Sequence, residues 1–133
     1  QQLYLWQQQF PGSIPLTMSV NLSALQLLQP DLIQAIQQIL AQTRISPDSL
    51  KLEITESVLI ENQQTATTVL SELRRMGIQL YVDDFGTGYS SLGRLQELPI
   101  DVLKIDRSFV QKKQWDISET IVLLANKLGL DVI

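Results

Sequence analysis

The sequence has 133 residues, enough for one modest domain with a hydrophobic core, and its 44% hydrophobic and 18% charged residues are typical of a globular rather than a disordered chain. Cysteine and histidine are both absent, which excludes disulfides and thiolate metal sites and leaves a carboxylate, a lysine or a metal-bound water as the possible general base. The net charge of −4 argues against nonspecific binding to nucleic-acid backbones, and no apolar run approaches the ~20 residues of a membrane span.

The first half of the chain is predicted to form a helix, a strand, a second helix and a second strand. Residues 1–10 are glutamine-rich and predicted to be helical, with Leu3, Trp6 and Phe10 roughly on one face. Strands are predicted over 16–23 and 50–56. The helix between them has apolar residues at helical spacing, namely Leu32, Ile33, Ile36, Ile39 and Leu40.

The same alternation continues through the second half. A helix with one apolar stripe is predicted to end at Gly77, and strands are predicted over 78–84 and 101–106. A glycine-containing loop over 85–91 and a short helix lie between these two strands. The apolar stripe of the first helix consists of Ala66, Val69, Leu70, Leu73 and Met76.

The last predicted helix precedes one more strand, over 130–133. Asp116 and Glu119 have the spacing of a capping box at the start of the helix, and Gly129 is predicted to end it. Its predicted buried stripe consists of Ile117, Ile121, Leu124 and Leu128.

Strands that alternate with helices indicate βαβ units and a parallel sheet. A complete (β/α)₈ barrel takes ~250 residues, and this chain has about half of that. We therefore predict an α/β fold that forms part of a TIM-like barrel.

Each of the first four predicted strands has one apolar face and one face with a polar group near its C-terminal end. If the apolar face meets the helices, the polar groups point into the barrel and meet at its C-terminal mouth, where barrel enzymes place their chemistry. These polar residues are Asn21, Glu53, Asp83 and Lys104.

Each polar residue also has an ordinary structural explanation. Asn21 alone is most often a turn or cap residue, Glu53 alone a residue of a solvated edge, and Lys104 alone a solvated or salt-bridged side chain. Such groups at the same end of successive parallel strands are harder to explain in this way, because burying them unpaired would cost on the order of several kcal/mol.

The Asp83-Asp84 pair suggests a metal site, because adjacent carboxylates repel unless a cation lies between them. Oxygen donors without histidine or cysteine suit Mg²⁺ or Mn²⁺, and two such ions can clamp a phosphodiester and activate a water. An Asp-Asp pair also opens ordinary turns. The segment that follows, Phe85-Gly86-Thr87-Gly88, is less common, and its two glycines allow the backbone to bend near the site.

Four segments closely resemble the EAL domain of bacterial cyclic di-GMP phosphodiesterases. They are Val20-Asn-Leu-Ser, Leu52-Glu-Ile-Thr-Glu-Ser, Asp83-Asp-Phe-Gly-Thr-Gly-Tyr-Ser-Ser-Leu and Leu103-Lys-Ile-Asp-Arg-Ser-Phe-Val, in this order. The resemblance covers nearly the whole chain, so 1–133 is expected to be one partial EAL domain made of central βα units. The family's Glu-Ala-Leu strand and its later Ala-Glu-Gly-Val-Glu strand do not occur in this sequence.

The resemblance implies a metal-dependent barrel enzyme, with one antiparallel strand, that hydrolyses cyclic di-GMP to linear pGpG. It implies two Mg²⁺ or Mn²⁺ ions in the complete domain. The metal ligands that it implies are Asn21, Glu53, Asp83 and Asp84, and the catalytic residues are Lys104, Asp83 and Asp84. It further implies that Glu56 stabilises the loop and that the loop next to the substrate contains Phe85, Gly86, Thr87 and Gly88.

The resemblance also suggests a context for the chain. We expect a cytoplasmic protein, or the cytoplasmic part of a membrane-anchored one, with sensory or diguanylate cyclase domains in the parent chain. A half-barrel exposes strand edges, so we expect a homodimer. The parent domain is expected to be active and the chain alone impaired. The alternatives are a catalytically inactive cyclic di-GMP receptor module and a half-barrel fragment whose main property is self-association.

Overall fold

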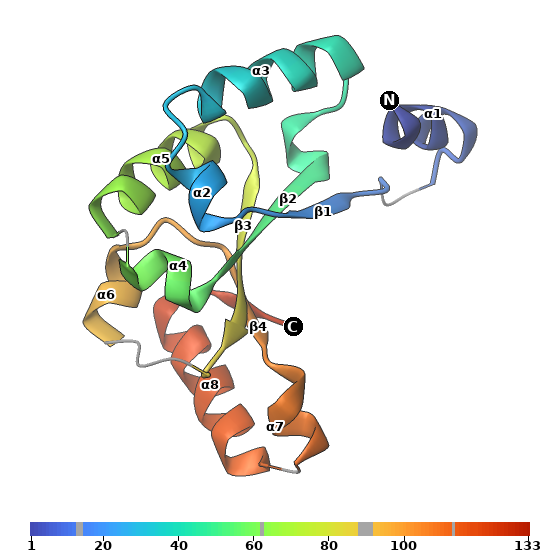
Figure 1. Cartoon of the computed structure of the whole chain (residues 1–133). Coiled ribbons are helices and arrows are strands. Elements are labelled where there is room, and N and C mark those ends of the chain that lie inside the picture. Colours follow the sequence, from blue (N-terminus) through green and yellow to red (C-terminus); the bar gives the residue numbers. More distant parts are fainter. Residues whose placement is uncertain (13–14, 62, 88–91, 113) are drawn as a thin grey trace.

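In the computed structural model, the sheet has five parallel strands in the order β1-β2-β3-β4-β5 (Figure 1). The structure describes residues 1–12, 15–61, 63–87, 92–112 and 114–133. The strands are β1 (Met18–Asn21), β2 (Leu50–Thr55), β3 (Gln79–Phe85), β4 (Val102–Ile105) and β5 (Asp131–Val132). The helices are α1 (Gln2–Gln9), α2 (Ala24–Leu27), α3 (Leu32–Thr43), η1 (Pro47–Ser49), α4 (Glu56–Glu61), α5 (Gln63–Arg75), α6 (Leu92–Glu97), α7 (Arg107–Gln111) and α8 (Trp115–Leu128).

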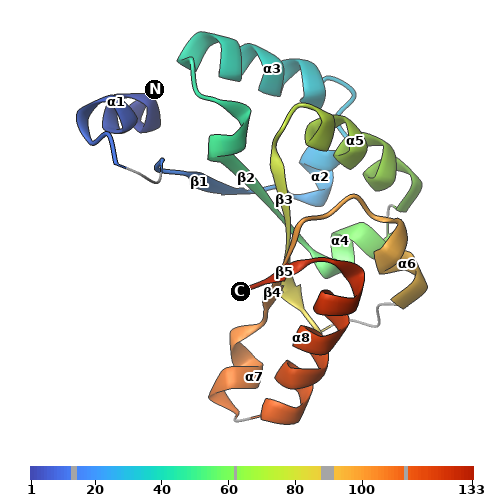
Figure 2. The same ribbon diagram turned by 180° about the vertical axis from the view of Figure 1, so that it is seen from behind.

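Because each strand pairs in parallel with the next one along the chain, every connection has to cross over the sheet. The crossing helices α3, α5, α6 and α8 lie on the same side of the sheet in both opposite views (Figures 1 and 2). This arrangement confirms the predicted α/β fold with a parallel sheet. The antiparallel strand that the resemblance implies is not among the strands that the structure describes.

The hydrophobic core lies between the sheet and these helices. The apolar residues of the strands alternate as predicted, since Leu52, Leu80 and Leu103 are all buried against the helices. On the helix side, α5 contributes fully buried residues, namely Ala66, Leu70 and Leu73. Polar residues between the apolar ones therefore face the other side of the sheet.

Two glycines end helices as predicted. Gly77 follows α5 with φ +91°, and Gly129 follows α8 with φ +70°. In both cases the next residue donates its N–H back into the last turn: Ile78 to the carbonyl of Leu73, and Leu130 to that of Ala125. This is the Schellman arrangement, in which the left-handed residue lets the chain leave the helix with its last carbonyls satisfied.

The predicted capping box at the start of α8 is wrong. The helix begins at Trp115, so Asp116 lies inside its first turn and not at the N-cap. Gln114 is the N-cap residue and makes no side-chain capping hydrogen bond. Of the predicted buried stripe, Ile121 is buried but Ile117 is exposed, because the start of α8 extends beyond the sheet (Figure 1).

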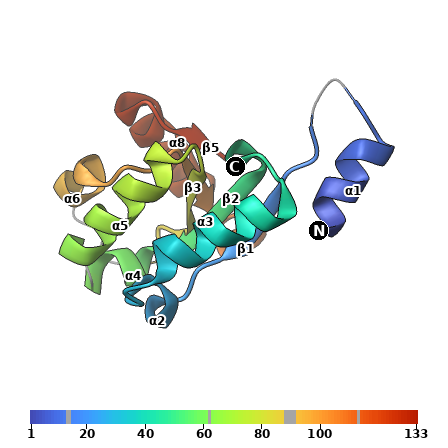
Figure 3. The same cartoon turned by 90° about the horizontal axis from the view of Figure 1, so that it is seen from above.

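The helix predicted over residues 1–10 is confirmed as α1, which covers Gln2–Gln9. Leu3 is buried, but Trp6 and Phe10 are exposed, because α1 lies apart from the other helices (Figure 3). Its link to the rest of the chain includes Gln7, whose side-chain amide donates to the Leu16 carbonyl at 2.6 Å and to the Ser49 hydroxyl at 2.9 Å.

The predicted first strand is too long, whereas the helix predicted after it is confirmed as α3. β1 covers only Met18–Asn21, and all of its residues, Val20 included, are exposed at the edge of the sheet. Ile39 of α3 is exposed as well, although it has the predicted helical spacing. None of the helices in the described ranges is long and apolar enough to cross a membrane.

Candidate functional site

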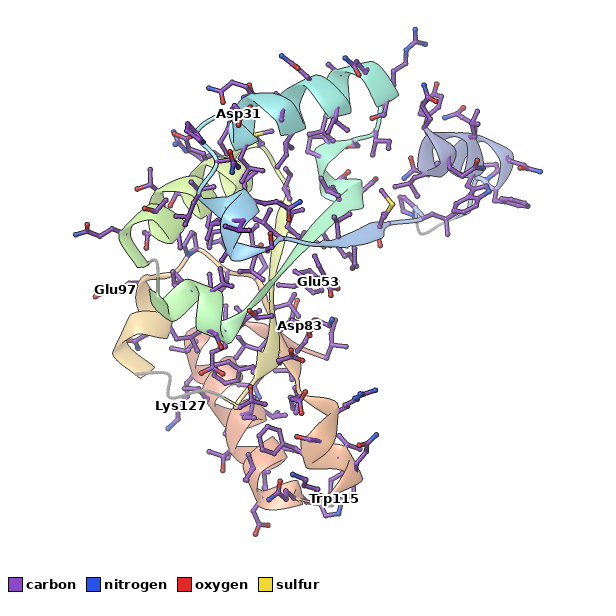
Figure 4. All side chains as sticks on the ribbon, in the orientation of Figure 1. Asp31, Glu53, Asp83, Glu97, Trp115 and Lys127 are labelled. Atoms are coloured by element: carbon purple, nitrogen blue, oxygen red, sulfur yellow. The ribbon has the colours of Figure 1, made fainter. Side chains whose placement is uncertain are left out.

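Three of the predicted site residues meet at the C-terminal end of the sheet. Glu53 comes from β2, Asp83 from β3 and Lys104 from β4. Glu53 and Lys104 each lie between two apolar strand residues, and Asp83 follows the buried Val82, so the three side chains leave the face opposite the core. In Figure 4, Glu53 and Asp83 both project from the strands on the side away from α5 and α6.

The Lys104 ammonium links the two carboxylates. Its Nζ lies 2.6 Å from Glu53 Oε2 and 3.0 Å from Asp83 Oδ1. The Glu53 side chain is only 12% exposed, so water screens its ion pair less than it screens a surface pair. Burial disfavours the charged amine, but the hydrogen bonds to Glu53 and Asp83 outweigh it and raise the pKa of Lys104 above its usual value. Lys104 is therefore a cation at neutral pH.

Asn21 lies beside this group, at the end of β1. Its register partner on β2 is Glu53, so the two side chains leave the same face of neighbouring strands. Both residues line a pocket of about 510 Å³ between β1, α2, β2 and α4. The pocket is lined by Asn21, Leu22, Ser23, Ala24, Gln26, Glu53, Thr55 and Val58.

A β-bulge brings the second aspartate to the same place. Val82 pairs with Leu103 and Phe85 with Ile105, so β3 has one more residue than β4 over this stretch. The extra residue places both Asp83 and Asp84 opposite Lys104. Asp84 takes the left-handed conformation, with φ +54°, which aspartate tolerates better than most residues.

Asp106 joins the site from the end of β4 and was not assigned a role from the sequence. Its carboxylate accepts a hydrogen bond from the Ser108 N–H at 2.8 Å, which caps α7. The charge of Asp106 also raises the pKa of the neighbouring Asp84 carboxyl. The strand alternation placed Asp106 on the polar face together with Lys104, and that was the signal from which it could have been found.

The two aspartates have opposite pKa shifts. Desolvation, then the charges of Asp83 and Asp106, raise the pKa of Asp84 above its usual value, against the opposing charge of Lys104. The hydrogen bonds that Asp106 accepts from Ser108 lower the pKa of Asp106.

The loop after the bulge is tightly held at Gly86. Its N–H donates to the buried carboxylate of Glu56 at 3.0 Å, and its φ is +96°. A Cβ at this position would lie 2.9 Å from Phe109 Cε2 and 3.1 Å from Ile121 Cδ1. Only glycine fits this backbone conformation and this space together.

The other predicted loop residues differ in their surroundings. Phe85 is buried in the core, while Thr87 is exposed and donates its hydroxyl to the Asp84 carbonyl at 2.8 Å. Gly88 lies outside the described residues. Within the described loop, Thr87 is the residue whose side chain faces solvent, since Gly86 has none.

The donor set has the chemistry of a site for a hard divalent cation. Glu53 and Asp83 supply carboxylate oxygens that both contact the Lys104 ammonium, and Asn21 adds a neighbouring amide oxygen. Among the described residues, no group of three or more acidic, histidine or cysteine side chains is close enough to hold a metal ion. The residues therefore fit Mg²⁺ or Mn²⁺ in donor type, and a full coordination sphere needs further ligands.

A parallel sheet with carboxylates, an amide and a lysine at its C-terminal end is the arrangement of part of a TIM-like barrel, which carries its polar groups at that end. The family model for the EAL domain matches residues 1–133, and the chain belongs to this family.

Similar proteins agree with this assignment. The chain is 39% identical over 125 residues to the cyclic di-GMP phosphodiesterase PdeR of Escherichia coli K12, covering 90% of this chain and 19% of that protein. A solved structure described as the PaMucR phosphodiesterase in complex with c-di-GMP matches 98% of this chain and 58% of its own, with a TM-score of 0.88 and 35% identity. The EAL domain of Mycobacterium smegmatis DcpA matches with a TM-score of 0.87 and 34% identity, covering 98% of this chain and 60% of that one.

The chain thus spans less than a fifth of PdeR, and about three fifths of the two solved chains.

Replacing Gly86 with alanine is expected to destabilise the protein more than replacing Gly129. Both glycines have positive φ, so each change costs about 1–2 kcal/mol of backbone strain. At Gly129 nothing lies within 4 Å of the added Cβ, whereas at Gly86 the contacts with Phe109 and Ile121 add about 1–3 kcal/mol. Urea unfolding measures both losses, and equal losses would contradict the close packing at Gly86.

Replacing Asp84 with asparagine is expected to stabilise the protein at neutral pH when EDTA is present. Because its pKa is raised on folding, Asp84 contributes stability below its usual pKa and loses that contribution as pH rises through the raised value. Asparagine also tolerates the left-handed backbone. The gain should be below about 1 kcal/mol, since Asp84 is exposed to solvent.

The measurement for Asp84→Asn is the thermal midpoint at pH 7 and at pH 4, compared with the exposed aspartate variant Asp116→Asn. The Asp84 variant should gain stability relative to the wild type as pH rises from 4 to 7. A gain that is the same at both values, or a loss at pH 7, would contradict the assigned shift.

Proposed function

We propose that the complete domain to which this chain belongs is a metal-dependent phosphodiesterase that hydrolyses cyclic di-GMP to linear pGpG. The observation that carries the proposal is the convergence of two carboxylates at the C-terminal end of the sheet. Glu53 and Asp83 both contact the Lys104 ammonium, at 2.6 and 3.0 Å from its Nζ. The names of the similar proteins support the substrate, since PdeR is a cyclic di-GMP phosphodiesterase and PaMucR is described in complex with c-di-GMP.

Each site residue has a role in this proposal. Asn21, Glu53, Asp83 and Asp84 hold Mg²⁺ or Mn²⁺, which when bound polarises the phosphodiester and lowers the pKa of a coordinated water. Lys104 contacts the phosphate or the attacking water with its ammonium group.

The loop residues have supporting roles. Glu56 keeps the loop in shape through its hydrogen bond with the Gly86 N–H, so that Asp83 and Asp84 stay opposite Lys104. The segment from Phe85 to Gly88 lies next to the substrate, and of its described residues Thr87 is the side chain available for contact. Asp106 places a further carboxylate near Asp84, and its charge disfavours the ionised form of Asp84 when no metal is bound.

The acidic site residues of this chain can bind an anionic substrate only when a divalent metal ion is present. The described site contains the carboxylates of Glu53, Asp83, Asp84 and Asp106 and the ammonium of Lys104, and the chain as a whole carries −4. A phosphodiester would be repelled by the carboxylates without divalent cations between them. Activity should therefore be lost in EDTA and return with Mg²⁺ or Mn²⁺.

The test is hydrolysis of cyclic di-GMP with Mg²⁺ or Mn²⁺, by this chain and by the complete domain. In the complete domain, Asp83→Asn should lower the rate at least about a hundredfold, because it removes a metal ligand and one partner of Lys104. The control Asp116→Asn, at an exposed aspartate of α8, should keep wild-type activity. Chromatography of linear pGpG measures both.

Each outcome of this assay decides between the functions considered. Turnover that Asp83→Asn leaves unchanged would exclude the assigned role. Binding of cyclic di-GMP without any turnover by the complete domain would instead identify a receptor module. If this chain alone forms no product while the complete domain does, ligands from outside residues 1–133 are required.

We further propose that the chain alone associates with a second copy. β1 and β5 are the two edges of the described sheet, and β1 exposes Met18 and Val20 at its edge. An unpaired edge with exposed apolar residues favours pairing with another chain. Light scattering of the isolated chain should give the mass of a dimer, whereas a stable monomer would contradict this expectation.

For the protein as a whole we propose that residues 1–133 form one partial EAL domain of a cytoplasmic protein or of the cytoplasmic part of a membrane-anchored one. Sensory or diguanylate cyclase domains in the same parent chain would then supply the signal that controls the site. The proposal is supported by the extent of PdeR that lies outside the match.

A further inference from the structure

Lys104 contacts the same carboxylate oxygens to which the proposed function assigns a metal ion. Its Nζ lies 2.6 Å from Glu53 Oε2 and 3.0 Å from Asp83 Oδ1. A divalent cation bound by Glu53 and Asp83 needs oxygens from both side chains at about 2.0–2.2 Å. The ammonium and the metal therefore compete for the same two groups.

We propose that Lys104 is an internal counter-ion that holds Glu53 and Asp83 together before a metal binds, and that a divalent cation must displace it from at least one of them. This inference rests on the proposed metal site. Lys104 would then have two roles: it contacts the phosphate or the attacking water, and it sets the affinity of the site for metal.

The surroundings of the three side chains favour this role. They come from three neighbouring strands, so the ammonium is held by the sheet and not by a flexible loop. The side chains of Glu53, Asp83 and Lys104 are 12%, 26% and 27% exposed, which leaves the ion pairs only partly screened. Without the ammonium, the two carboxylates would face each other as uncompensated anions.

The proposal predicts effects of opposite sign when the charge of Lys104 is removed. In EDTA, Lys104→Met should lower the thermal midpoint by about 3–6 °C, because the repulsion between Glu53 and Asp83 is no longer offset. The same variant should bind Mn²⁺ about tenfold more tightly, because the oxygens are free. A residue that only shaped the site would weaken both stability and metal binding when lost.

Mn²⁺ affinity is measured on the full-length protein that carries this chain, from the electron paramagnetic resonance signal of free Mn²⁺ during titration. The matched control is Lys51→Met, which removes one positive charge from β2, on the strand face that also carries Glu53. The Lys51 ammonium lies 5.3 Å from the centroid of the Tyr81 ring. Its Mn²⁺ affinity should stay within about threefold of wild type, because the ion pairs that Glu53 and Asp83 form in the described part of the chain are with Lys104 and not with Lys51.

The outcomes separate this inference from the proposed function. Tighter Mn²⁺ binding together with lower stability in EDTA supports the counter-ion role. If the wild type binds Mn²⁺ and Lys104→Met binds it equally or more weakly, the counter-ion role is excluded while the metal site stands. If neither protein binds Mn²⁺, the metal site itself is excluded, and both proposals fail. Should Lys104→Met not fold, Lys104→Gln, which keeps a hydrogen-bond donor without the charge, makes the same comparison.

Discussion

The sharing of one ammonium by two carboxylates from neighbouring strands is the interaction on which the C-terminal end of this sheet depends. Glu53 and Asp83 carry like charges on adjacent parallel strands, and Lys104 of the next strand lies between them, with contacts of 2.6 and 3.0 Å. Without a cation at this point, the same backbone pairing would bring two anions together in a partly buried place, which is unfavourable. The position of Lys104 on the polar face of β4 thus allows an acidic site to form at all.

The β-bulge and the loop that follows it depend on this arrangement and extend it. The extra residue on β3 brings Asp84 to the same side as Asp83, and the left-handed conformation of Asp84 turns the chain towards Gly86. Gly86 is held by Glu56 from one side and packs against Phe109 from the other. The acidic end of β3 is therefore connected to α4 and α7 through direct contacts, so a shift of either helix would displace the carboxylates of Asp83 and Asp84.

The opposite end of the sheet is built for stability. Asp101, just before β4, accepts the Leu80 N–H at 2.9 Å and forms an ion pair with Arg74 at 3.0 Å. It thereby joins β3, β4 and the end of α5 by hydrogen bonds and charge. Barrels characteristically have stabilising contacts at the N-terminal ends of their strands and their chemistry at the C-terminal ends.

The sequence by itself determined the order of the strands and of the longer helices between them, the apolar and polar faces of β2, β3 and β4, and the glycines that end α5 and α8, because each of these depends on local spacing and local backbone freedom. The short helices α2, η1, α4 and α7 were not predicted. The tertiary structure alone decided which apolar faces are covered: Trp6 and Ile117 have helical spacing but stay 47% and 39% exposed. It also decided the bulge at Asp84 and the approach of the Asp106 carboxylate to Asp84. These depend on the register between strands far apart in the sequence, which a residue pattern within one strand does not contain.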